Sequence, residues 1–162
     1  MIPHYRTILY ATDLTPNAAH AFRHAISLAR CHNAKVYIVH ILPEVDAAVV
    51  NYVATVMGED KLAGMEISRL DEVTGQIHRR LLSFAQSELT DHPEDLERVA
   101  SVEVLHGHPS AEILDAADRL DVDLVVLGSH GKGKLKYAFL GSVAEKVLRK
   151  TLRPVMIVPL GD

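Results

Sequence analysis

Cysteine and aromatic residues are scarce in this chain. Its 162 residues include a single cysteine, Cys31, so no disulfide can form within the chain, and tryptophan is absent. A lone cysteine is typical of a protein that folds in a reducing compartment. Aromatic residues make up 5% of the sequence, so Val, Ile, Leu and Ala must fill most of the core.

Long hydrophobic runs are missing as well. No stretch approaches the roughly 20 apolar residues that a membrane-spanning helix needs. The segment Met1–Arg6 lacks the charged and apolar regions of a signal peptide. Together with the lone cysteine, these absences predict a cytoplasmic protein without a membrane partner.

Neither sign of charge dominates the sequence. Seventeen Lys and Arg stand against twenty-one Asp and Glu, which leaves a formal charge of −4. This balance excludes a strongly basic protein that coats nucleic acid. A basic cluster between Lys134 and Arg153 contains few aromatic residues, and we interpret it as a solvated surface, so no nucleic-acid partner is expected.

The remaining composition is that of an ordinary globular domain. Hydrophobic residues make up 48% and charged residues 23% of the chain. A chain of this length can bury most of its unfolded surface without a metal or a disulfide. We therefore predict a single domain over residues 1–162.

Short apolar runs predict five β-strands. Four of them are continuously apolar, which is typical of a parallel sheet that helices cover on both faces. The third in chain order alternates more and fits a position near an edge. The predicted strands are Thr7–Ala11, Lys35–Leu42, Ala100–Leu105, Asp123–Leu127 and Val155–Val158.

Helical patterns lie between the strands, with apolar residues three and four positions apart. The predicted helices are Pro16–His32, Glu66–Leu89, Ser110–Leu120 and Ser142–Thr151. This alternation predicts an α/β fold, a Rossmann-like doubly wound parallel sheet of five strands in the order 3-2-1-4-5 with helices on both faces. The weakly periodic segment Pro43–Met65 is predicted to be a mobile excursion, partly helical around Asp46–Met57.

A ligand site is expected beyond the carboxyl ends of the strands, where open α/β sheets bind their ligands. The first predicted strand ends at Thr12-Asp13, and the fourth runs into a loop rich in Gly and Lys. Glycine lets backbone N–H groups approach an anion closely. The loop leads to a helix that begins near Gly141-Ser142, and a helix N-terminus offers unpaired N–H donors. These features predict a phosphate-binding site.

Two well-known phosphate motifs do not fit this loop. Gly128-x4-Gly133-Lys134 lacks the Ser or Thr of a P-loop, because Leu135 follows the lysine. The dinucleotide fingerprint also fails, since Lys136 stands where its third glycine belongs.

The loop instead has the spacing Gly128-x2-Gly131-x9-Gly141-Ser142. With this spacing the chain resembles the universal stress protein family, in its ATP-binding branch, and the resemblance covers nearly the whole sequence. Further matching segments are Thr12-Asp13, Leu105-x-Gly107-x-Pro109-x3-Ile113-Leu114, Asp123–Gly128 and Arg153–Pro159.

The resemblance implies where a nucleotide lies. Asp13 lies near the ribose, where a carboxylate can accept hydrogen bonds from sugar hydroxyls. Backbone at His40 and Ile41 meets the adenine, and the glycines with the start of the last helix hold the phosphates, whose charge His130 and the nearby lysines offset. The full set is Thr12, Asp13, Ile41, Gly128, Ser129, His130, Gly131, Gly141, Ser142 and Val143. The implied cofactor is ATP, alone or with Mg²⁺ or Mn²⁺.

Simpler interpretations exist for the same residues. Asp13 could be a turn or cap residue ahead of the first helix, and the glycine loop could be only a connection. His20 and His24 lie four apart, but no third ligand accompanies them, so we predict no metal site. No residue is predicted to be catalytic, because neither a positioned base nor metal ligands can be identified.

The sequence thus favours a cytosolic ATP-binding stress or signalling protein whose nucleotide occupancy tunes its dimer or its contact with an unknown protein partner. Alternatives are a nucleotide-hydrolysing or nucleotidyl-transfer enzyme on the same fold, and a nucleotide-free interaction module. As a sheet edge, Val155–Val158 would be an exposed apolar strand in a monomer. We expect it to pair with a second copy, and the family resemblance implies the same antiparallel homodimer.

Overall fold

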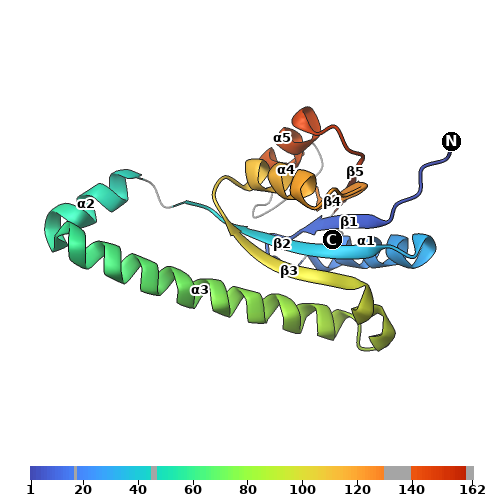
Figure 1. Cartoon of the computed structure of the whole chain (residues 1–162), viewed down its shortest axis with the longest axis horizontal. Coiled ribbons are helices and arrows are strands. Elements are labelled where there is room, and N and C mark those ends of the chain that lie inside the picture. Colours follow the sequence, from blue (N-terminus) through green and yellow to red (C-terminus); the bar gives the residue numbers. More distant parts are fainter. Residues whose placement is uncertain (17, 45–46, 130–139, 160–162) are drawn as a thin grey trace.

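The computed structural model describes residues 1–16, 18–44, 47–129 and 140–159 of the chain. Strands and helices alternate along most of it (Figure 1). The strands are β1 (Thr7–Ala11), β2 (Lys35–Leu42), β3 (Val99–His106), β4 (Leu124–Gly128) and β5 (Val155–Val158). The helices are α1 (Ala18–His32), α2 (Ala47–Met57), α3 (Glu59–Glu88), α4 (Pro109–Arg119) and α5 (Ser142–Lys150), with a short 3₁₀ helix, η1 (Pro93–Arg98), before β3.

The five strands form one parallel sheet in the order β3-β2-β1-β4-β5. This confirms the doubly wound fold and the strand order expected from the sequence. The order reverses at β1, which has β2 on one side and β4 on the other. A crevice at the carboxyl ends of β1 and β4 is therefore where such a sheet places a ligand.

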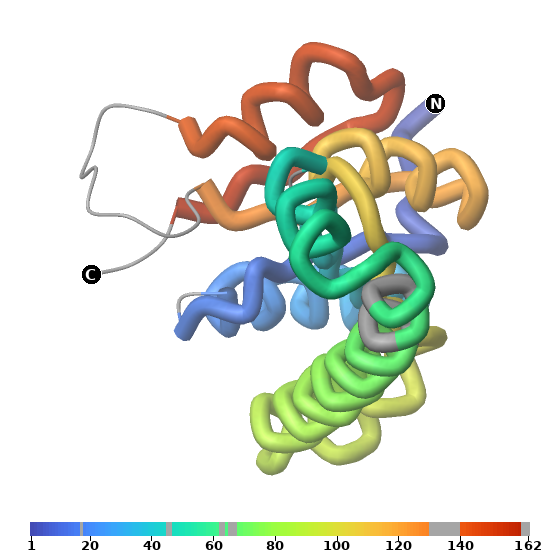
Figure 2. The backbone as a smooth tube through the Cα atoms, turned by 90° about the vertical axis from the view of Figure 1, so that its left-hand side faces the viewer, coloured from blue at the N-terminus to red at the C-terminus, as the bar shows by residue number. Residues whose placement is uncertain are grey.

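Two hydrophobic cores fill the two sides of the sheet, because its strands are apolar on both faces. α1 and α3 cover one side, and α4 and α5 cover the other (Figure 2). On the first side Tyr10, Phe22 and Leu81 are fully buried, and the rings of Tyr10 and Phe22 lie 5.5 Å apart. On the second side Leu9 and Val147 are fully buried. The sheet is thus rigidly packed beneath the edge that carries the predicted site.

The segment after β2 is more helical than predicted. Of the predicted excursion Pro43–Met65, residues 47–57 form α2 and α3 already begins at Glu59, seven residues before the predicted start at Glu66. Gly58 joins the two helices with a φ of 89°, a left-handed value that favours glycine. α2 lies where the partly helical stretch around Asp46–Met57 was predicted. The start of α3 was missed because its described residues Glu59, Asp60, Lys61 and Gly64 are exposed, so no core-facing stripe marks it as a helix.

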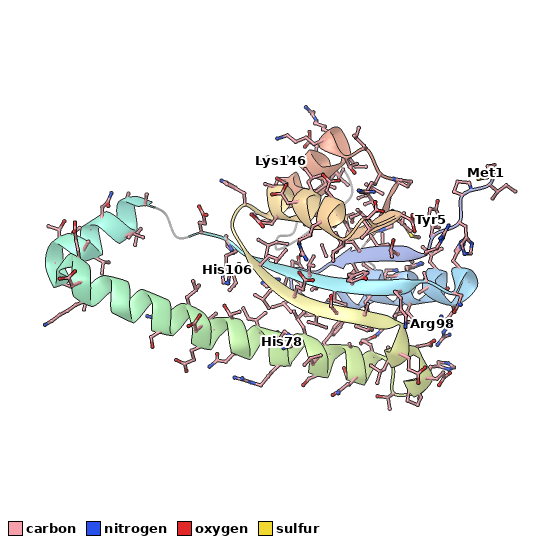
Figure 3. The ribbon with its side chains drawn as sticks, in the orientation of Figure 1. Met1, Tyr5, His78, Arg98, His106 and Lys146 are labelled. Atoms are coloured by element: carbon pink, nitrogen blue, oxygen red, sulfur yellow. The ribbon has the colours of Figure 1, made fainter. Side chains whose placement is uncertain are left out.

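α2 and the first half of α3 extend beyond the sheet as an arm (Figure 1). The second half of α3 packs on the sheet, where Leu81 and Ala85 are buried. A hydrogen bond of 3.2 Å between Thr74 Oγ1 and His106 Nε2 joins α3 to the carboxyl end of β3, where Figure 3 labels His106. The arm is therefore attached to the sheet edge that carries the predicted site.

Asp123 fixes the start of β1 against β4. The sequence predicted Asp123 as the first residue of the strand, but β4 begins one residue later, at Leu124. The Asp123 carboxylate accepts hydrogen bonds from the amides of Arg6 (2.7 Å) and Thr7 (2.9 Å). Burial raises the pKa of Asp123, but donation from these amides and from the Thr7 hydroxyl outweighs it, so the pKa lies below its ordinary value. This anchor sets the β1–β4 register on which the site depends.

Candidate functional site

The turn after β1 is held by hydrogen bonds of its own residues. Thr12 is buried, its N–H donates to the Val39 carbonyl of β2 (2.9 Å), and its Oγ1 accepts from the Leu14 amide (3.1 Å). Asp13 Oδ1 accepts from the amide and the hydroxyl of Thr15 (3.0 and 2.7 Å). Within the described part of the chain, Asp13 Oδ2 has no hydrogen-bond partner. Asp13 is therefore both a turn residue and a half-buried carboxylate with one oxygen available.

The end of β2 lies beside this turn. His40 Nδ1 lies 2.8 Å from the Thr12 carbonyl oxygen. The next residue, Ile41, has a side chain that is only 6% exposed and packs in the core under α4 and α5. Ile41 could therefore meet a ligand only through its backbone, as the family resemblance implied.

The end of β4 comes together with the start of α5. The Ser129 amide donates to the Val158 carbonyl of β5 (2.9 Å), and the Gly141 amide donates to the Ser129 carbonyl (2.7 Å). Twelve positions apart in the sequence, Ser129 and Gly141 are thus direct neighbours. The predicted site residues His130 and Gly131 lie outside the described residues.

The N-terminus of α5 lies at this edge. Gly141 is its N-cap, and no side chain of the described residues caps the helix by a hydrogen bond. Ser142 is exposed and Val143 is half-buried. The first-turn N–H groups of a helix lack partners within the helix and carry partial positive charge, so they can bind an anion.

The two halves of the site meet across adjacent strands. Tyr10 of β1 pairs in register with Val126 of β4. Two residues further along both strands, this register places Thr12 opposite Gly128, and neighbouring strands lie about 4.8 Å apart. The acidic turn after β1 and the glycine-bounded segment after β4 therefore share one edge. A carboxylate and the first-turn N–H groups of a helix at one sheet edge can bind a ligand that carries both hydroxyl groups and an anionic group.

Gly107, at the carboxyl end of β3, also has a structural reason to be glycine. Its φ is 139°, and a Cβ atom there would lie 2.8 Å from Glu112 Oε1 of α4. Its amide donates to the Leu42 carbonyl at the end of β2 (3.0 Å). This glycine closes the β3–α4 turn tightly against β2.

Metal ligands do not gather at this edge in the part of the chain that is described. There, the group of ligand-type side chains within reach of one another is His92, Glu94 and Asp95, at the opposite end of β3. Asp95 is already paired with Arg30 and Arg98. The rings of His20 and His24 contact each other edge to face, with centroids 5.0 Å apart.

Comparison with known proteins places the fold and the glycine spacing in one family. The family model described as "Universal stress protein family" matches residues 4–159 of this chain. The chain belongs to the universal stress protein family.

The similarity to individual universal stress proteins spans whole chains. The chain is 30% identical over 158 residues to universal stress protein MJ0577 of Methanocaldococcus jannaschii, which covers 95% of this chain and 94% of that protein. It is 28% identical to stress response protein NhaX of Bacillus subtilis, with 96% and 98% covered. The solved structure of MJ0577 superposes with a TM-score of 0.62 at 27% identity, covering 99% of both chains. The fold of UspA from Lactobacillus plantarum matches with a TM-score of 0.66 at 20% identity, covering 97% of this chain and 99% of that one.

Sequence reasoning missed one side chain of this universal stress protein's candidate site. It assigned only the backbone near His40 to the ligand, whereas the imidazole ring contacts the Thr12 carbonyl. The available signal was a histidine at the end of a buried strand next to β1.

Among the described helices, none is long and apolar enough to cross a membrane.

Proposed function

We propose that this protein is a cytoplasmic nucleotide-binding protein that holds ATP at the carboxyl edge between β1 and β4. The observation that carries the proposal is that the Asp13 turn after β1 and the N-terminus of α5, which is tied to the end of β4, lie at the same carboxyl edge of adjacent strands. Two solved universal stress proteins support an adenine nucleotide. One was solved in complex with cAMP, and one from Archaeoglobus fulgidus in complex with dAMP. The nucleotide, in this proposal, tunes association with a second copy or with another protein.

Each part of the nucleotide has a partner in this proposal. Asp13 Oδ2 accepts from ribose hydroxyls, while Oδ1 continues to hold the turn through Thr15. The N–H groups at Ser142 and Val143 donate to the phosphates, with the Ser142 hydroxyl as a further donor. Backbone at Ile41 meets the adenine. Gly128, Ser129, His130 and Gly131 complete the proposed set, in which Mg²⁺ or Mn²⁺ accompanies the phosphates when a metal is present.

Mass spectrometry of nucleotides released on denaturing the purified protein tests the proposal, together with an ATP titration of the stripped protein. We expect released ATP, or a dissociation constant of about 1–100 μM for ATP and the stripped protein. A few charge-assisted hydrogen bonds to the nucleotide are enough for an affinity in this range. Release of mainly ADP or AMP would favour a nucleotide-hydrolysing enzyme instead. If the protein releases no nucleotide and the titration gives no signal, the proposal is overturned, and the interaction module remains as the explanation.

Replacing Asp13 with alanine is expected to weaken ATP binding by roughly 10- to 100-fold. A hydrogen bond to a charged group contributes about 1.5–3 kcal/mol, and alanine also removes the turn contacts to Thr15. Asp13→Asn is the matched control, because its amide oxygen can still accept from Thr15 while the negative charge is lost. Isothermal titration calorimetry of both variants measures the effect, and wild-type affinity in both would remove Asp13 from the site.

The homodimer remains part of the proposal and has its own test. β5 is an edge strand that pairs with β4 on one side, and Leu152 just before it is fully exposed. We expect light scattering after size exclusion to give about 36 kDa, twice the 17.8 kDa of one chain. Hydrogen exchange should be slower in β5 than in β3, the other edge strand, because a second copy would protect β5. A mass of one chain, or equal exchange at both edges, would contradict this dimer.

A further inference from the structure

The imidazole of His40 links β2 to the turn that carries Asp13. Its Nδ1 lies 2.8 Å from the carbonyl oxygen of Thr12, twenty-eight positions earlier in the chain. A carbonyl oxygen can only accept, so Nδ1 carries the proton and donates. Among the described residues, His40 is the side chain of β2 that hydrogen-bonds this turn. The turn is also held by the Thr12 amide on the Val39 carbonyl, by bonds among its own residues, by the Tyr10 hydroxyl of β1 on the Ala18 carbonyl, and by packing of Leu14 against the core.

The turn needs such support because its backbone is strained. Leu14 has a φ of 63°, in the left-handed region that a branched L-residue rarely adopts. Strained positions persist only where the surrounding structure holds them in place. Thr12, two positions before Leu14, is held at its N–H by the Val39 carbonyl and at its own carbonyl by His40. In the sequence, Asp13 stands between Thr12, which these bonds hold, and the strained Leu14.

We propose that His40 is a positioning residue for nucleotide binding, which fixes the β1–α1 turn through the Thr12 carbonyl and thereby places the Asp13 carboxylate against the ribose. This inference rests on the proposed function, since it assigns a role within the same site. His40 itself need not touch the nucleotide. Its effect on affinity passes through Asp13.

Two substitutions separate the hydrogen bond from the packing of the ring. His40→Phe keeps a ring of similar size but has no N–H to donate. His40→Asn places an amide NH₂ the same number of bonds from Cα as Nδ1, so the donor is restored. We expect His40→Phe to weaken ATP binding about 10-fold, as the loss of one ordered hydrogen bond can, and His40→Asn to stay within about 3-fold of wild type.

A double-mutant cycle with Asp13 tests the route of the effect. In the Asp13→Ala background, His40→Phe should change ATP affinity by less than about 2-fold, because the group that it positions is gone. A merely structural role would lower the unfolding temperature and reduce affinity by the same factor in both backgrounds. Calorimetric titration with ATP gives the four affinities, and thermal unfolding gives the stability of each variant.

The outcomes distinguish this inference from the function on which it rests. The wild-type titration alone decides whether the protein binds ATP, and without binding both proposals fall. With wild-type binding intact, an unchanged affinity in His40→Phe overturns the inference, as does an equal loss in the presence and absence of Asp13. If His40→Phe does not fold, His40→Leu, which also lacks a donor but is smaller, takes its place in the same cycle.

Discussion

Replacing Gly141 with valine is expected to lower the affinity for ATP by at least about 100-fold while the fold is kept. Gly141 has φ −59° and ψ 149°, values that any L-residue adopts, so the backbone itself does not require glycine there. Valine is a poorer N-cap than glycine, and we expect the unfolding temperature to fall by no more than about 3 °C. The large effect should fall on the ligand, since a branched side chain at the start of α5 would occupy the space where, in the proposed function, phosphate oxygens meet the first-turn N–H groups. Two lost charge-assisted hydrogen bonds are enough for a factor of about 100.

A matched control comes from a glycine elsewhere in the chain. A Cβ atom at Gly64, in the arm, would meet nothing within 4 Å, so Gly64→Val adds the same side chain in open space. Its ATP affinity should equal that of the wild type, and Gly141→Ala should fall between the wild type and Gly141→Val. Calorimetry with ATP and thermal unfolding of all three variants measure both quantities. Wild-type affinity in Gly141→Val would mean that the phosphates do not bind at the start of α5.

Replacing Asp95 with asparagine is expected to lower the midpoint of thermal unfolding at pH 7 by about 6 °C, through a loss of about 2 kcal/mol. Asp95 is 2% exposed and lies between the guanidinium groups of Arg30 and Arg98, the latter at 3.1 Å. Arg98 also donates to Asn33 Oδ1 (3.1 Å). The cluster joins η1 to the end of α1 and so fixes where β3 begins. Asparagine keeps the shape of the side chain but removes the charge that both arginines face.

The effect of Asp95 should depend on pH. Hydrogen bonding from Arg30 lowers the pKa of Asp95, burial opposes it, and Arg98 lowers the pKa further, so the net direction is downward. A carboxyl group with a lower pKa in the folded state stabilises the protein above its unfolded pKa of about 3.9. That contribution is lost as the pH falls through the folded pKa. Because the variant lacks the titrating group, the difference between wild type and Asp95→Asn should shrink from pH 7 toward pH 3.

Asp91 provides the control for the Asp95→Asn measurements. It is exposed and lies four positions earlier, so Asp91→Asn should leave the unfolding midpoint within about 1 °C of wild type at every pH. Thermal unfolding followed by circular dichroism between pH 3 and pH 7 measures all three proteins. A difference between wild type and Asp95→Asn that stays constant over this range would contradict the assigned pKa direction.

The strands were predictable because burial on both faces leaves a local record in the sequence. β1 and β2 have the bounds predicted from their apolar runs, and the alternation with helices predicted the doubly wound parallel sheet that the structure has. The glycine spacing that ends at Gly141 is also a property of the sequence, and by itself it indicates the family. The occupancy of the site and the role of its residues stay predictions until the titrations are made.

The first turns of α3 and the small helix η1 were missed for the opposite reason. A helix is marked in the sequence by the stripe that it buries, and the described residues in the first turns of α3, which are Glu59, Asp60, Lys61 and Gly64, are exposed. η1 is short and contains a buried acid, Asp95, where an apolar residue would have drawn attention. Its arginine partner Arg30 lies sixty-five positions away, so no local pattern reveals the pair.

The sequence by itself determined the fold class and the family, since both depend on apolar runs, helical periods and a glycine spacing that are local to single segments. Only the tertiary structure decided which groups meet at the candidate site. It joined Gly141 to Ser129, left one oxygen of Asp13 without a partner among the described residues, and brought the His40 imidazole to the Thr12 carbonyl. Contacts of this kind depend on strand register and on the direction of individual side chains. Both are fixed by the packing of residues far apart in the chain, and the one-dimensional pattern does not contain them.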